Sequence, residues 1–110
     1  MTSPHILIVA SECDAAVEDD YNAWYDDVHL PMFMGFAGLK RASRFRLAGE
    51  APGAARYLAV YEFETAAARA GFTQSQAYAA AVRDFDEKWQ NGGFHGKWAA
   101  AYERLAAYER

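Results

Sequence analysis

The stretch from Tyr21 to Pro31, YNAWYDDVHLP, constrains the fold most, because it concentrates aromatic and titratable side chains within about three helical turns. In a helix, residues three and four positions apart lie on the same face. One such face carries four large apolar residues, Tyr21, Trp24, Tyr25 and Val28. An apolar stripe at helical spacing normally packs against a core. We therefore predict a helix over about residues 17–30, ended by Pro31, with this face buried.

A second set of side chains follows the flank of the same predicted helix. Asn22, Asp26 and His29 are spaced by four and three residues, and these spacings bring side chains within reach of each other. Asp26 could therefore hold the His29 imidazole in one tautomer or raise its basicity, which suits general acid/base catalysis. The alternative is that His29, just before Pro31, serves only as a partner of the helix dipole or of the helix-end carbonyls.

Two segments have clear strand patterns, one near the start of the sequence and one just past its middle. His5–Ala10 is a short continuous apolar run, which is typical of a strand in the centre of a sheet. Arg56–Glu64 alternates with period two instead. One face of this second strand is mostly aromatic, with Tyr57, Ala59, Tyr61 and Phe63, and the other carries Leu58 and Val60.

Three runs of the sequence resemble a known family. They are the stretch from Tyr21 through WYDDVHLPMF, then FAGLKRASRFRLAG, then RYLAVYEFET. Together they resemble small proteins of the dimeric α/β-barrel superfamily, in the branch related to EthD. Ala37-Gly38 stands where relatives often carry Pro-Gly, and the glycine is retained. The resemblance implies an α+β fold: a ferredoxin-like, four-stranded antiparallel sheet with helices on one face, paired with a second copy as a dimeric α/β barrel.

The second half of the chain fits this order of elements. Thr65–Glu87 is rich in alanine and predicts a helix broken at Gly71, with Thr73 or Ser75 capping its longer part. Residues 97–108 have a composition that favours helix. Their alternation of Trp98, Ala100 and Tyr102, together with the fourth strand that the resemblance requires, leads us to predict a strand instead.

The segment Leu39–Ala48 alternates with period two and carries arginine on both faces. Simple alternation places Leu39, Arg41 and Ser43 on one face and Arg44 on the other. If one face lies under the helices and the other lines the barrel, at least one arginine is buried, and a buried arginine needs a partner. That partner is either a carboxylate of the protein or an anionic, enolate-like ligand.

Composition excludes several classes of function. The 110 residues are expected to form a single domain over residues 1–110, and 53% of them are hydrophobic. A net charge of −4 argues against nucleic acid or an anionic membrane as partner. The N-terminal apolar run is too short for a signal peptide or a membrane span. We therefore expect a cytoplasmic protein whose partners are a small molecule and a second copy of itself.

The candidate catalytic residues are His29, Asp26 and Tyr25. A further six residues are candidates for binding the substrate: Asn22, Trp24, Arg41, Ser43, Arg44 and Tyr61. Three histidines far apart in sequence and a lone cysteine, Cys13, do not have metal-ligand spacing, and no glycine-rich phosphate loop is present. We therefore expect neither a metal nor a cofactor.

Two functions remain open from the sequence. The first is a cofactor-free enzyme that acts on a small apolar, aromatic or polyketide-like substrate, by acid/base cyclisation or isomerisation or by oxygenation. The resemblance supports the oxygenation variant, since enzymes of this superfamily use residue types such as Asn22, Trp24 and His29 to hold an electron-rich substrate. The second is a non-catalytic dimer that binds a hydrophobic ligand or assists another enzyme. In both cases the aromatic face of Tyr57, Tyr61 and Phe63 is expected to cover the partner subunit.

Overall fold

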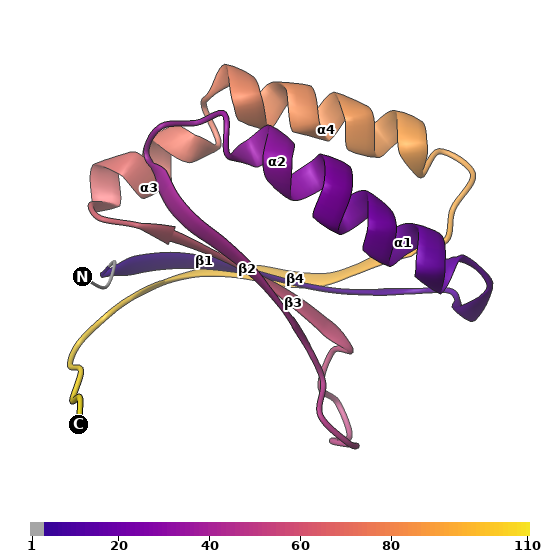
Figure 1. Ribbon diagram of the computed structural model, residues 1–110, viewed down its shortest axis with the longest axis horizontal. Helices are drawn as coiled ribbons and strands as arrows, with labels where there is room; N and C mark the ends of the chain where they lie inside the picture. The colour runs from indigo at the N-terminus through magenta and orange to yellow at the C-terminus, as the bar shows by residue number, and fades with distance from the viewer. Residues whose placement is uncertain (1–3) are drawn as a thin grey trace.

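A computed structural model describes residues 4–110 as a four-stranded antiparallel sheet with its helices on one face (Figure 1). The strands are β1 (His5–Cys13), β2 (Leu39–Arg46), β3 (Tyr57–Phe63) and β4 (Phe94–Glu103), in the order β2-β3-β1-β4. The predicted ferredoxin-like arrangement is confirmed, and β1 is a central strand as expected. Residues 1–3 of the predicted domain lie outside the described residues.

The first helical segment is longer than predicted, because it continues through Pro31. It consists of the short 3₁₀-helix η1 (Ala15–Val17), α1 (Glu18–Trp24), the π-helix η2 (Tyr25–His29) and α2 (Leu30–Phe33). In a regular α-helix the proline ring would clash with the carbonyl four residues earlier. The wider turn of the π-helix ends just before Pro31 and relieves that clash, so the prediction that Pro31 ends the helix is wrong.

The π-helix also changes which residues face the core. A π turn contains one residue more than an α turn, so the inward position moves along by one residue. Val28, predicted to be buried, is 37% exposed, whereas His29 is only 7% exposed. His29, and not Val28 as predicted, is therefore the residue of this turn that is buried in the core.

The second helical segment consists of α3 (Ala66–Phe72) and α4 (Gln76–Lys88). The Ser75 hydroxyl accepts a hydrogen bond from the backbone amide of Tyr78 at 3.1 Å, so Ser75 is the N-cap of α4. The predicted break at Gly71 is wrong, since Gly71 lies inside α3 and the helix is interrupted at residues 73–75. The cap, rather than the glycine, determines where the longer helix begins. Among residues 4–110, no helix has the length and apolar character needed to cross a membrane.

A bulge at the start of β2 changes the predicted faces of that strand. Leu39 pairs with Phe63, but Arg41 pairs with Glu62, so the register shifts by one residue between them. Leu39 is therefore buried on the helix side of the sheet, while Arg41 is exposed. The prediction that these two residues share a face is wrong.

The predicted faces of β3 are confirmed, but their expected roles are reversed. The side chains of the aromatic face are at most 4% exposed and pack under the helices: Tyr57, Ala59, Tyr61 and Phe63. They belong to the core of the subunit and are not available to a partner. The opposite face of the sheet has no helix over it (Figure 1), and it leaves Phe45, Trp98 and Tyr102 between 45% and 54% exposed.

The prediction of a fourth strand is confirmed, but its first and last residues differ from the predicted ones. β4 begins at Phe94 and ends at Glu103, whereas the predicted strand covered residues 97–108. The chain from Arg104 to Arg110 has no regular structure, and its Leu105 and Tyr108 are more than nine-tenths exposed.

Candidate functional site

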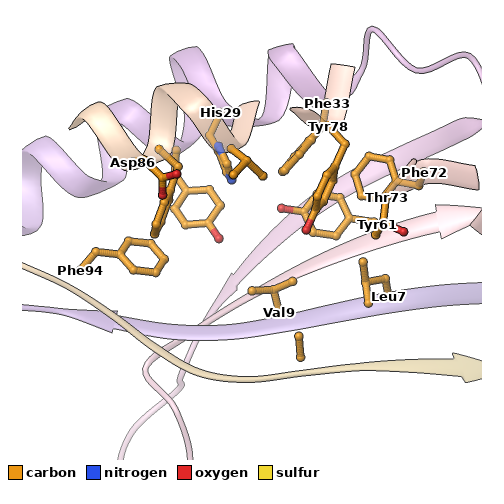
Figure 2. Close-up of a pocket in the computed structure, with 14 residues that line it drawn as sticks. Leu7, Val9, His29, Phe33, Tyr61, Phe72, Thr73, Tyr78, Asp86 and Phe94 are labelled. Atoms are coloured by element: carbon orange, nitrogen blue, oxygen red, sulfur yellow. The ribbon is translucent and has the colours of Figure 1, made fainter. Parts of the chain in front are cut away.

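A cavity of about 430 Å³ lies between the helices and the sheet. Figure 2 shows His29 and Tyr78 projecting into it from the helical layer, and Leu7 and Val9 from β1. Its inner wall consists of buried side chains, Tyr25, His29, Phe33, Tyr61 and Phe72. Its mouth is marked by the exposed lining residues Thr73, Val82, Asp86 and Ala99. The volume is within the range of small-molecule sites in proteins.

His29 is the one buried titratable nitrogen base in the inner wall of this cavity. Its ring stacks on Trp24, with 4.4 Å between the ring centroids and 24° between the planes. The edges of Tyr25 and Phe33 contact it at centroid distances of 5.1 and 4.4 Å. Its Nδ1 is buried and has no hydrogen-bond partner among residues 4–110. A buried polar atom without a partner is unusual in a folded protein. This nitrogen is closed off from solvent, so the other ring nitrogen, Nε2, is the candidate for contact with a ligand.

Burial sets the charge of His29. The apolar surroundings lower the pKa of His29 from 6.5 to about 4, and the negative charge of Asp84 opposes that effect only in part. The imidazole is therefore uncharged at neutral pH. An uncharged imidazole carries one donor and one acceptor nitrogen, so His29 can both take up and return a proton.

Trp24 lies behind His29 and does not line the cavity. Its indole Nε1 donates a hydrogen bond to Asp84 Oδ2 of α4 at 2.9 Å. This bond joins α1 to α4 and fixes the aromatic plane on which His29 stacks. Trp24 thus supports the candidate base from behind, and a direct contact with a ligand, which the sequence predicted, is not part of this geometry.

Two tyrosines of the inner wall, Tyr25 and Tyr61, remain protonated at neutral pH. Burial raises the pKa of Tyr25, although Ser11 and Arg44 oppose the shift. Burial, together with the neighbouring Tyr25, raises the pKa of Tyr61 well above its usual value. A phenol that keeps its proton can donate a hydrogen bond to a substrate oxygen on which negative charge develops.

The predicted pairing of Asp26 with His29 is wrong, because Asp26 turns away from the cavity. Asp26 accepts a hydrogen bond from Arg44 at 2.8 Å, and Asn22 accepts another from the same guanidinium at 2.8 Å. The Arg44 guanidinium also lies over the Tyr25 ring, 4.5 Å from its centroid. The mostly buried Arg44 thus has a protein carboxylate as its partner, one of the two alternatives left open by the sequence.

Apart from Trp24, the candidate site residues therefore lie in three places. Tyr25, His29 and Tyr61 line the cavity. Asn22, Asp26 and Arg44 line a separate polar depression that shares no lining residue with the cavity. Arg41 and Ser43 lie outside both, since Arg41 is exposed beside Glu62, and Ser43 pairs with Val60 on the open face.

Sequence reasoning missed the part of the cavity wall contributed by α3, α4 and β4. Phe72, Tyr78, Phe85 and Phe94 all line it. The spacing of Tyr78, Val82 and Phe85 indicates a buried helix face, but nothing in the sequence says that this face borders a cavity and not a filled core. Within residues 4–110, no three histidine, cysteine or carboxylate side chains gather as they would around a metal ion.

The fold is similar to that of dimeric α/β-barrel proteins. It is similar to HapK from Hahella chejuensis, with a TM-score of 0.71 and 18% identity over 96% of this chain and 97% of HapK. It is similar to an EthD family protein from Bacillus halodurans, with a TM-score of 0.69 and 11% identity over 96% of this chain and all of the other. A variant of SnoaB, a cofactor-independent oxygenase from Streptomyces nogalater, has a TM-score of 0.62 and 9% identity over 98% of this chain and all of SnoaB.

The sequence itself identifies the family. The model of a family described as a domain of unknown function, DUF4286, matches residues 5–95, so the chain belongs to that family. No curated protein matches the chain in sequence. The resemblance to dimeric α/β-barrel proteins that the sequence indicated is thus confirmed for the fold, and the matched structures include a member of the EthD family.

Proposed function

We propose that the cavity is the active site of a cofactor-independent enzyme that acts on a small apolar, aromatic or polyketide-like molecule. The observation that supports this most is the uncharged, buried His29 in the wall of a mostly apolar cavity. A base in a dry pocket beside hydrogen-bond donors is what proton abstraction next to a carbonyl requires. Perturbed titratable groups in a concave site are typical of catalytic residues.

In the proposed reaction, His29 removes a proton from a carbon atom next to a carbonyl group or between aromatic rings. The electron pair moves toward the carbonyl oxygen, where the hydroxyl group of Tyr25 or Tyr61 stabilises the charge. The low pKa makes His29 a weak base, but the imidazolium and the enolate attract each other strongly in a cavity of low dielectric constant. His29 then returns its proton to another atom of the substrate, which completes an isomerisation or a cyclisation.

Oxygenation is a variant of the same first step. The carbanion adds molecular oxygen, and the peroxide takes the proton back from His29. Loss of water then leaves a new carbonyl group, so a CH₂ group and O₂ give C=O and H₂O. The similarity of the fold to SnoaB, a cofactor-independent oxygenase, favours this variant. At 9% identity the similarity concerns the fold alone.

The alternative function is a dimer that binds a hydrophobic ligand in this cavity without changing it. The same apolar wall supports it, since most of the lining residues are aromatic or aliphatic. It differs from the enzyme in one testable respect: a binding protein has no need of His29 as a base.

We also propose that the protein is a homodimer that pairs through the open face of its sheet. Phe45, Trp98 and Tyr102 lie exposed on that face, and an apolar sheet face without a covering layer is unfavourable in water. This replaces the interface predicted from Tyr57, Tyr61 and Phe63, which are buried in the subunit.

The experiment uses anthrone, a tricyclic ketone with an acidic CH₂ group, in deuterated buffer under argon. NMR spectroscopy follows the exchange of its CH₂ protons with the wild type, with His29→Gln and with Val28→Ala as a matched control. Val28 precedes His29 in the same turn but does not line the cavity. We expect the wild type and Val28→Ala to accelerate exchange equally, and His29→Gln to be on the order of a hundredfold slower.

Admitting air then distinguishes the two variants of the reaction, because only oxygenation consumes O₂. Binding of anthrone by the wild type without any acceleration of exchange would favour the binding protein. A folded His29→Gln variant that exchanges anthrone at the wild-type rate would refute His29 as the base.

A further inference from the structure

The charge of the cavity wall restricts which ligands can enter. Among the described residues that line the cavity, none is lysine or arginine, and Asp86 at the mouth is an acid. His29 adds no positive charge at neutral pH, since burial lowers its pKa to about 4. A negatively charged ligand would therefore meet no opposite charge in the wall.

Two cationic side chains near the cavity pair with groups outside it. Arg44, over the Tyr25 ring, donates hydrogen bonds to Asp26 and Asn22. Lys88, at the end of α4, forms an ion pair of 2.7 Å with Asp20. Neither residue lines the cavity.

The titratable groups of the inner wall are uncharged at neutral pH. Tyr25 and Tyr61 keep their protons because burial raises the pKa of both, and burial lowers the pKa of His29. Phenols and imidazole pair well with hydroxyl and carbonyl groups. A carboxylate transferred from water into such a wall would lose its hydration without gaining a counter-ion.

We infer that the cavity selects uncharged ligands, so that the substrate is a neutral aromatic molecule with hydroxyl or carbonyl groups, and carboxylates of the same shape are excluded. That the ligand is a substrate rests on the proposed function. The preference for uncharged ligands is a property of binding alone. It means that any carboxyl group of a natural precursor must be removed, esterified or amidated by another enzyme before the molecule enters this cavity.

The test compares two molecules that differ in charge and hardly in shape, naphthalene-2-carboxamide and naphthalene-2-carboxylate. Isothermal titration calorimetry at neutral pH measures the affinity of the whole protein for each. We expect the carboxamide to bind and the carboxylate to bind at least about tenfold more weakly, because an unpaired buried charge is costly. Equal or tighter binding of the carboxylate would overturn the inference, and so would failure of the carboxamide to bind.

A pair of variants at the mouth shows whether the selection arises in this cavity. Val82 lies on α4 at the mouth and is 36% exposed, so longer side chains can be placed there. Val82→Lys and Val82→Met have stems of similar length and differ mainly in charge. Val82→Lys should reduce the preference for the carboxamide by about tenfold relative to Val82→Met. If the two variants discriminate equally, the probes bind elsewhere and the inference fails.

These measurements are independent of turnover. If His29→Gln exchanged anthrone as fast as the wild type, the proposed function would fail while the selection for neutral ligands could still be observed. If the carboxylate bound as well as the carboxamide, the inference would fail while His29 could still act as the base.

Discussion

Acidification should destabilise this protein in a way that depends on His29. In the folded chain His29 has a pKa of about 4, because its charged form is buried without adequate compensation. In the unfolded chain it has the ordinary value of about 6.5. Between these two values the unfolded state binds a proton that the folded state does not. Stability conferred by neutral His29 is therefore fully present above pH 6.5 and is lost as the pH falls toward 4.

The size of the loss follows from the two pKa values. Each pKa unit corresponds to about 1.4 kcal/mol, so a fall from 6.5 to about 4 amounts to about 3 kcal/mol. His29 is only 7% exposed, so solvent screening reduces this figure little. Small domains are stable by roughly 5–15 kcal/mol, so one residue controls a substantial share.

Urea unfolding of the wild type and His29→Gln at pH 7 and pH 4 measures the effect. Carboxylates titrate in both proteins, so their contribution cancels in the comparison. On going from pH 7 to pH 4 the wild type should lose about 3 kcal/mol more of its free energy of unfolding than His29→Gln. An equal loss in the two proteins would refute the burial of an uncharged His29.

Three further predictions concern the fluorescence, the core and the assembly. Binding of an aromatic ligand should change the tryptophan fluorescence through Trp24, which stacks on His29, and a Trp24→Phe variant with an unchanged response would place the signal elsewhere. Ser11→Ala leaves the buried Tyr21 hydroxyl without its 2.6 Å partner and should cost about 1–3 kcal/mol in urea unfolding; a loss below about 0.5 kcal/mol would contradict that role. Analytical ultracentrifugation at micromolar concentration should find a dimer that Trp98→Glu converts to monomer, whereas a wild-type monomer would disprove pairing through the open face.

Much of the fold could be predicted because local patterns and packing agree. The alternation in Arg56–Glu64 predicts the two faces of β3 correctly, since period two requires only a regular strand. The π-helix at Tyr25–His29 and the bulge after Leu39 could not be predicted in the same way. Each inserts one residue into a regular element and moves the side chains that follow to different faces.

The candidate site could be predicted only in part for the same reason. His29 and Tyr25 can be predicted because their chemistry is visible in the sequence, and both line the cavity. Helical spacing pairs Asp26 with His29 only if the helix is regular, and the actual partner of Asp26, Arg44, lies on a different element. The charge of His29 could not be predicted at all, because it depends on how completely Trp24 and Phe33 exclude water.

The pH dependence of proton abstraction tests the central role of His29 most directly. In the anthrone exchange assay, kcat/KM of the wild type should be constant from pH 8 down to about pH 5 and should fall at lower pH with a midpoint of about 4, where His29 takes up a proton. A midpoint near 6.5 would mean that the base is a solvated histidine. A profile that His29→Gln shares with the wild type would mean that His29 does not carry the reaction.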